Sequence, residues 1–136
     1  MKRILFDTNV VLDVLLDRRA HAEASTRAWA AVENGVAEGM LAAHAVTTIH
    51  YLVRKELGTA RAKGVVSAVL RILTVASVDD AILQEALQLP FSDFEDAVTA
   101  AAARSAGCDY ILTRDPKGFR ESPVRAMTPE AAMPLL

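Results

Sequence analysis

Short apolar segments with β-strand character alternate with longer segments of helical spacing along the whole chain. The strand candidates are residues 2–6, 39–43, 74–78, 109–113 and 124–127. The helix candidates are residues 10–15, 22–32, 45–57, 61–73, 80–89 and 92–105, with a short helix from residue 129. Parallel strands need crossover connections, so this alternation favours a parallel sheet covered by helices on both faces. We therefore expect an α/β fold.

The longest helix signal near the C-terminus begins at Ser92. Ser92 is followed three residues later by Glu95, which is the capping-box pattern and predicts Ser92 as the N-cap. The helix is rich in alanine at positions 97 and 100–103 and is expected to end before Gly107. Such small side chains allow a helix to pack closely against a sheet.

Length and composition indicate one domain over residues 1–136, because 52% of the residues are hydrophobic and can form a core. No apolar run is long enough to span a bilayer, and the N-terminus lacks the apolar segment of a signal peptide, so we expect a cytoplasmic protein. The single cysteine, Cys108, cannot form an internal disulfide and is expected to be a small buried residue beside a strand. The formal net charge of −2 argues against a broad basic surface for nucleic acid, unless a bound cation cancels some of the acids.

Acidic residues follow two of the predicted strands and begin one helix. Asp7 ends the first strand, Asp115 follows the fourth, and Asp93 and Asp96 lie at the start of the alanine-rich helix. The carboxyl ends of parallel strands share one edge of a sheet, so these carboxylates are expected to lie together. Two carboxylates about 4 Å apart repel by roughly 4 kcal/mol at an effective dielectric near 20, which favours a bound divalent cation. Oxygen ligands suit Mg²⁺ or Mn²⁺, and such a metal can activate water for attack on a phosphodiester.

Each acid also has a structural interpretation when taken alone. Asp7 can cap a helix, Asp93 and Asp96 are favourable charges in a first helical turn, and Asp115 is a turn residue before Pro116. Their coincidence at one edge favours the metal site, but the residues alone leave both interpretations open.

Three blocks of the sequence resemble the PIN-domain nucleases in type, order and spacing. They are residues 4–13 with Asp7-Thr8-Asn9, residues 94–98 with the alanine helix that follows, and residues 110–119. The resemblance implies a three-layer α/β/α fold with about five parallel strands in the order 3-2-1-4-5. It also implies an endoribonuclease, a hydrolase that cleaves single-stranded RNA with Mg²⁺ or Mn²⁺.

Small members of this family are similar to the VapC-type toxin ribonucleases. That similarity implies a possible antitoxin protein as partner and a homodimer, which would cover apolar helix surface between Ala28 and Leu73.

The resemblance also implies roles for individual residues. Asp7, Asp96 and Asp115 take the catalytic and metal-ligand positions, with Asp93 as an additional candidate ligand. Asn9 and Thr113 take the places of polar residues that orient the ligands by hydrogen bonds.

One position departs from the family. Where the helix after the second strand usually carries a Glu, this chain offers His50 within the segment Thr47-Thr48-Ile49-His50-Tyr51. His50 is either a half-buried helix residue without a ligand role or a ligand or phosphate contact. His44, at the end of the second strand, is another candidate for the cleft.

Arg114, Lys117 and Arg120 border the predicted cleft and are candidates for RNA binding, as are Arg18 and Arg19 after the first helix. Solvated surface charge is the alternative for each.

Two other functions are considered. A phosphatase of the haloacid-dehalogenase type would need a second Asp two positions after Asp7, where this chain has Asn9. A PIN-fold dimerisation or partner-binding module, catalytically weakened by loss of the Glu, remains the non-enzymatic alternative.

Overall fold

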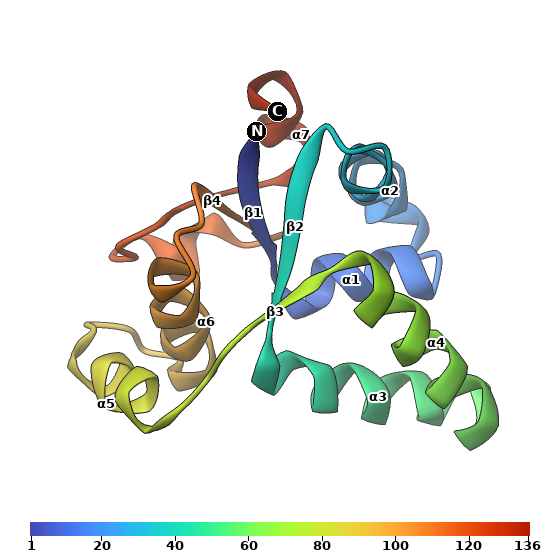
Figure 1. Cartoon of the computed structure of the whole chain (residues 1–136), viewed down its shortest axis with the longest axis horizontal. Coiled ribbons are helices and arrows are strands. Elements are labelled where there is room, and N and C mark those ends of the chain that lie inside the picture. Colours follow the sequence, from blue (N-terminus) through green and yellow to red (C-terminus); the bar gives the residue numbers. More distant parts are fainter.

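A computed structural model describes all 136 residues of the chain. Its centre is a five-stranded sheet in the order β3-β2-β1-β4-β5 (Figure 1). The strands are β1 (Lys2–Phe6), β2 (Ala37–Ala42), β3 (Thr74–Ala76), β4 (Tyr110–Leu112) and β5 (Arg125–Met127). Every neighbouring pair is parallel. The predicted fold class and strand order are confirmed.

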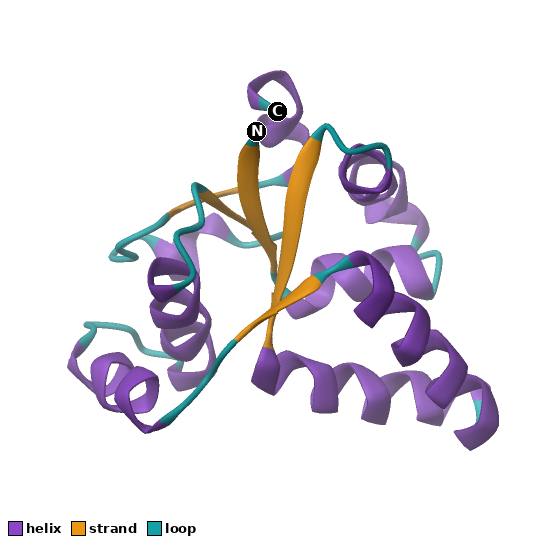
Figure 2. Cartoon of the chain, viewed as in Figure 1, coloured by secondary structure: helices purple, strands orange, loops and turns teal.

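Helices cover both faces of this sheet, with α5 and α6 on one side and α1 to α4 on the other (Figures 1 and 2). They are α1 (Thr8–Leu15), α2 (Arg19–Glu33), α3 (Ala43–Leu57), α4 (Thr59–Ile72), α5 (Asp80–Gln88), α6 (Phe94–Ser105) and α7 (Pro129–Ala132), with 3-10 turns η1 (Pro116–Phe119) and η2 (Met133–Leu135). Several elements begin two or three residues earlier than predicted, among them α2, β2 and α3, because their first residues do not extend the apolar pattern. None of these helices combines the length and the apolar character that crossing a membrane requires.

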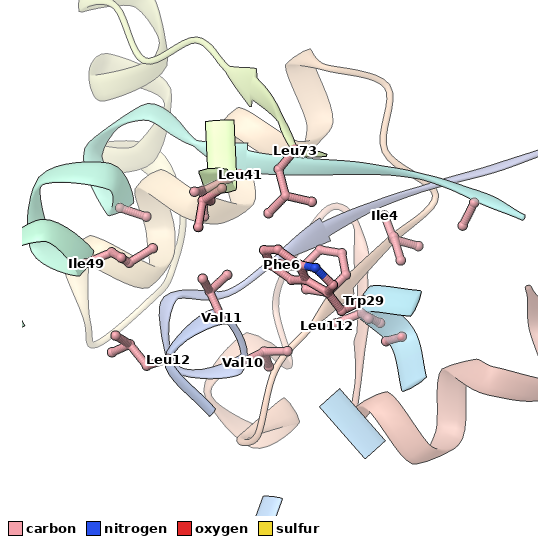
Figure 3. Close-up of a cluster of buried hydrophobic side chains, with 14 of the residues drawn as sticks. Ile4, Phe6, Val10, Val11, Leu12, Trp29, Leu41, Ile49, Leu73 and Leu112 are labelled. Carbon is pink, nitrogen blue, oxygen red and sulfur yellow. The ribbon is translucent and has the colours of Figure 1, made fainter. Parts of the chain in front are cut away.

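The core lies on both sides of β1, whose side chains alternate between the two faces. Ile4 and Phe6 pack with α1 to α4, whereas Leu5 packs with α6. Figure 3 shows the first of these clusters, where the rings of Phe6 and Trp29 meet edge to face with their centroids 5.9 Å apart. Burying a side chain of this size stabilises a fold by roughly 1.5–3 kcal/mol, so the core fixes the position of the strand that leads to Asp7.

Helix α6 packs against the other face through its alanines, as predicted. Ala97 and the four alanines from position 100 to 103 are buried. The predicted N-cap is wrong, however. Asp93 rather than Ser92 caps the helix, because its Oδ1 accepts a hydrogen bond of 3.0 Å from the backbone N–H of Asp96.

Cys108 is buried beside Met40, with their sulfur atoms 3.8 Å apart. Burial raises the pKa of the thiol to about 11. The residue is therefore the inert, small buried side chain that the sequence predicts.

Candidate acidic active site

Asp7 lies where the central strands β1 and β4 end side by side. Phe6 pairs with Leu112, so the next residues of the two strands, Asp7 and Thr113, are neighbours. Asp7 is half-buried and caps α1, with Oδ1 accepting from the backbone N–H of Thr8 at 2.9 Å. Burial raises the pKa of Asp7, and the nearby Glu95 raises it further, while hydrogen bonds from Thr113 and Thr8 and the nearby His44 lower it.

Thr113 connects two of the predicted ligands. Its buried hydroxyl donates to Oδ2 of Asp7 at 2.9 Å and accepts from the backbone N–H of Asp115 at 3.2 Å. A hydroxyl can donate one hydrogen bond and accept others, so a single side chain fixes both segments. The orienting hydrogen bond expected of Thr113 is present.

Asp96, in the first turn of α6, is half-buried and lies among other acids. Its pKa is raised to about 7, first by burial and then by the charges of Asp7, Asp93, Glu95 and Asp115. It forms no ion pair with any Arg, Lys or His. Its negative charge therefore has no cationic partner within the protein.

The carboxylates of Asp115 and Asp96 both lie next to Gly118. A Cβ atom built on Gly118 would lie 3.4 Å from Oδ2 of Asp96 and 3.4 Å from Oδ2 of Asp115. The backbone N–H of Gly118 donates to the carbonyl of Asp115 at 3.2 Å, which closes the turn that brings the glycine there. The three predicted acids thus come from three separate segments and lie near one another at the carboxyl edge of the sheet, where the charges of Asp7 and Asp115 raise the pKa of Asp96.

The structure also brings His44 to this edge. Its Nε2 lies 3.3 Å from Oγ1 of Thr99, whose hydroxyl donates to the carbonyl of Glu95 at 3.1 Å. Because that hydroxyl has only one proton to give, Nε2 of His44 is assigned as the donor to it. Nδ1 then carries a lone pair, and this atom is buried without a hydrogen-bond partner.

Three sequence predictions change with the structure. Asn9 is exposed and its Oδ1 accepts from Arg18 at 3.5 Å, so it does not orient an acid. Asp93 uses Oδ1 to cap α6, a role that the sequence analysis had given to Ser92. His50 is half-buried and forms no side-chain hydrogen bond or ion pair. It follows His44 by six residues, about 240° around the helix, so it does not share the face that carries His44.

Of the cations predicted to bind RNA, Arg114 is half-buried and paired with an acid of the protein. Its Nε lies 3.4 Å from Oδ2 of Asp13, which has no exposed surface, and Arg18 lies 3.9 Å from the other carboxylate oxygen. Burial raises the pKa of Asp13, and Arg114 is the first of the charges that lower it. Arg114 is therefore a structural partner of Asp13 rather than a free cation.

Sequence reasoning missed both Asp13 and Glu95. The available signal for Asp13 was an acid inside the otherwise apolar run of residues 10–16. Glu95 was assigned to a capping box, yet its charge raises the pKa of both Asp7 and Asp96.

Lys117 and Arg120 behave differently from Arg114, since neither forms an ion pair or a side-chain hydrogen bond. Both are exposed and line a cavity of about 330 Å³ together with Phe91, Ser92 and Gly118. Because Gly118 lines this cavity and also lies next to the carboxylates of Asp96 and Asp115, the two free cations lie beside the acidic edge.

The donor set suits a hard divalent cation. Carboxylate oxygens are the preferred ligands of Mg²⁺ and Mn²⁺, and the uncompensated charge on Asp96 favours a cation over any other ligand. No three His, Cys, Asp or Glu side chains converge as a complete ligand set in this structure.

A profile of the PIN domain matches residues 3–117 of the chain. Ribonuclease VapC1 of Aquifex aeolicus is 25% identical over 134 residues, which is 95% of this chain and 92% of that protein.

Solved structures share the fold. The DNA-bound VapBC of Salmonella typhimurium gives a TM-score of 0.72 at 19% identity, covering 95% of this chain and 99% of that chain. VapC20 of Mycobacterium tuberculosis, described as a toxin that cleaves the sarcin–ricin loop, gives 0.64 at 18% identity over 79% and 86% of the two chains. At these identities the likeness concerns the fold alone.

Proposed function

Because the chain belongs to the PIN-domain family, we propose that it is a metal-dependent endoribonuclease that hydrolyses phosphodiester bonds of single-stranded RNA. The observation that carries the proposal is the charge of Asp96. Burial and the charges of four other acids raise its pKa to about 7, and no cation of the protein forms an ion pair with it. Strongly perturbed groups of this kind cluster at functional sites.

The metal would be Mg²⁺ or Mn²⁺, held by Asp7, Asp96 and Asp115. When bound, such an ion lowers the pKa of a water molecule and stabilises charge on a phosphoryl oxygen. Thr113 holds Asp7 and the backbone of Asp115 in place. His44 is a further candidate ligand, since its Nδ1 is buried without a partner and the residue lies close enough to lower the pKa of Asp7.

RNA would approach from the side of Lys117 and Arg120. These cations are free to contact phosphate oxygens, whereas Arg114 is occupied by Asp13. Phosphate contacts of this kind position a nucleic acid without reading its sequence.

We also propose that the protein is the toxin of a toxin–antitoxin pair and forms a homodimer. The proposal is supported by the similarity to Ribonuclease VapC1 and by fold neighbours that include a toxin–antitoxin complex from Klebsiella pneumoniae. Tyr51 on α3 and Leu70 on α4 are exposed apolar side chains that an interface could cover. Light scattering at micromolar concentration should give the mass of two chains, and the mass of one chain would contradict the dimer.

Cleavage of single-stranded RNA tests the enzyme. The purified chain should cleave a single-stranded RNA with Mn²⁺ and lose this activity in EDTA. Asp96→Asn should abolish both cleavage and Mn²⁺ binding measured by calorimetry. Asp80→Asn, which changes an exposed first-turn aspartate of α5, is the matched control and should leave both unchanged.

The same experiment decides between the enzyme and the partner-binding module. A folded wild-type protein that binds no Mn²⁺ and cleaves no RNA would contradict the ribonuclease and favour a PIN fold kept for association.

A further inference from the structure

The cavity that Gly118 lines contains two cations and an aromatic ring, neither of which is needed to bind a metal at the acidic edge. We propose that it binds one nucleotide of the RNA strand, with the phosphate held by Lys117 and Arg120 and the base placed against Phe91. The inference rests on the proposed function, because the nucleotide would be a neighbour of the phosphodiester that is cleaved.

Two free cations form the phosphate-binding part of the cavity. Several other arginines of the protein have acidic partners, such as Arg3 with Glu38 and Arg104 with Glu85. Lys117 and Arg120 have none, although Glu121 also lines the cavity. The hydroxyl of Ser92 is likewise without a hydrogen bond within the protein. Two cations and a free hydroxyl provide donors for phosphate oxygens, and charge-assisted hydrogen bonds are the stronger kind.

An aromatic ring forms the part expected to hold the base. Phe91 is half-buried, and its ring meets that of the buried Phe119 edge to face, with centroids 5.8 Å apart and planes at 83°. This contact fixes the orientation of Phe91, which lines the cavity. A preformed aromatic wall beside cations is how proteins bind single-stranded nucleic acid, by stacking of bases and neutralisation of phosphates.

The size of the cavity limits the ligand to about one nucleotide. Its volume of about 330 Å³ lies at the small end of the roughly 300–1,000 Å³ found for ligand sites. The place of Gly118 indicates where along the RNA strand the bound nucleotide would lie. A Cβ atom built on Gly118 would lie 3.4 Å from Oδ2 of both Asp96 and Asp115, and Gly118 also lines the cavity, so a nucleotide bound there would lie beside the acids.

Binding can be measured without metal, so the test is independent of catalysis. In EDTA, uridine 5′-monophosphate, uridine and inorganic phosphate are titrated into the protein and followed by NMR chemical shifts. The mononucleotide should bind at least about tenfold more tightly than phosphate or uridine alone, because only it engages both parts of the cavity. Lys117→Ala and Arg120→Ala should each weaken its binding about tenfold. Phe91→Leu, which keeps an apolar contact with Phe119, should weaken binding of the mononucleotide but not of phosphate.

Lys63→Ala, which removes an exposed lysine of α4, is the matched control and should have no effect. Equal affinity for phosphate and the mononucleotide would overturn the inference, as would unchanged affinity in the Lys117 and Arg120 variants. A protein that cleaves RNA but gives either result would retain the proposed function without this subsite. A protein that binds the mononucleotide as described but cleaves no RNA would retain the subsite and lose the proposed reaction.

Discussion

Asp13 on α1 and Asp96 on α6 differ in how their negative charge is compensated. Asp13 has no exposed surface, yet two arginines of the protein lie within 3.4 and 3.9 Å of its oxygens. Asp96 is only half-buried, yet the charges around it are those of Asp7, Asp93, Glu95 and Asp115. The more deeply buried acid is paired, and the more accessible one is not.

This difference separates a structural charge from a functional one. The ion pair between Asp13 and Arg114 compensates both charges within the protein and restrains Arg114, the residue directly before Asp115. An acid whose neighbours are all acids costs stability unless something outside the protein compensates it. The comparison therefore makes Asp13 part of the scaffold and supports the proposal that Asp96 belongs to the active site.

The largest expected effect comes from breaking the Asp13–Arg114 pair. Arg114→Met should lower the free energy of unfolding by about 3 kcal/mol, because it leaves a buried carboxylate with only the more distant Arg18. The double variant Asp13→Leu/Arg114→Met removes both charges and should recover most of that loss. Urea unfolding of both variants gives the values.

A double variant as unstable as Arg114→Met would show that the two charges do not depend on each other. In that case Arg114 would have to be considered again as a free cation for RNA.

Removing the charge of Asp96 is expected to raise the free energy of unfolding, whereas breaking the Asp13–Arg114 pair lowers it. Its pKa is raised from the model-compound value of 3.8 to about 7, so between these pH values the folded protein retains a proton that the unfolded chain has released. The free energy of unfolding of the metal-free protein therefore falls as the pH rises through this range. Asp96→Asn removes the titration and should stabilise the protein by about 2 kcal/mol at pH 8, allowing for solvent screening.

The gain should disappear near pH 4, where the carboxyl of the parent protein is neutral. Urea unfolding in EDTA at both pH values measures it. If Asp96→Asn is destabilising at pH 8, the acid is a structural one like Asp13.

The sheet and the nearness of the acids could be predicted from the sequence because both follow from strand order. Asp7 follows β1, Asp115 lies three residues after β4 and Asp96 lies in the first turn of α6, so topology brings them to one edge, whereas their role as metal ligands remains a prediction. The Asp13–Arg114 pair could not be predicted in this way, since its members are far apart in sequence and their contact depends on how α1 packs beside the turn after β4.

Two further errors concern helix starts. Ser92 and Asp93 are both good N-caps, and only the backbone geometry selects Asp93. Helix α3 begins at Ala43 rather than at residue 45, which puts His44 in its first turn.

A smaller effect is expected at Gly118, which separates the acids from the cavity. Gly118→Ala places a methyl group 3.4 Å from the carboxylates of Asp96 and Asp115, an ordinary contact distance that the fold can accommodate. The free energy of unfolding should change by less than about 0.5 kcal/mol. A metal held by Asp96 and Asp115 would have to share this space with the methyl group, so Mn²⁺ affinity measured by calorimetry should fall about tenfold. Unchanged affinity would place the metal away from these two acids.

The smallest effect is expected at His50, the position where the sequence suggested a replacement for the family's Glu. A carboxylate added to a hard-cation site raises its affinity only if it can reach the ion. His50 lies about 240° around α3 from His44, whereas Thr48 lies one turn from His44 on the same face. His50→Glu should therefore leave Mn²⁺ affinity unchanged, while Thr48→Glu, half-buried and on the face of His44, should increase it. Calorimetric titration of the two variants compares equal changes of charge on two faces of one helix. If His50→Glu binds Mn²⁺ more tightly than Thr48→Glu does, the face of α3 that carries His50 lies towards the acids. His44 would then no longer be a candidate ligand beside Asp7.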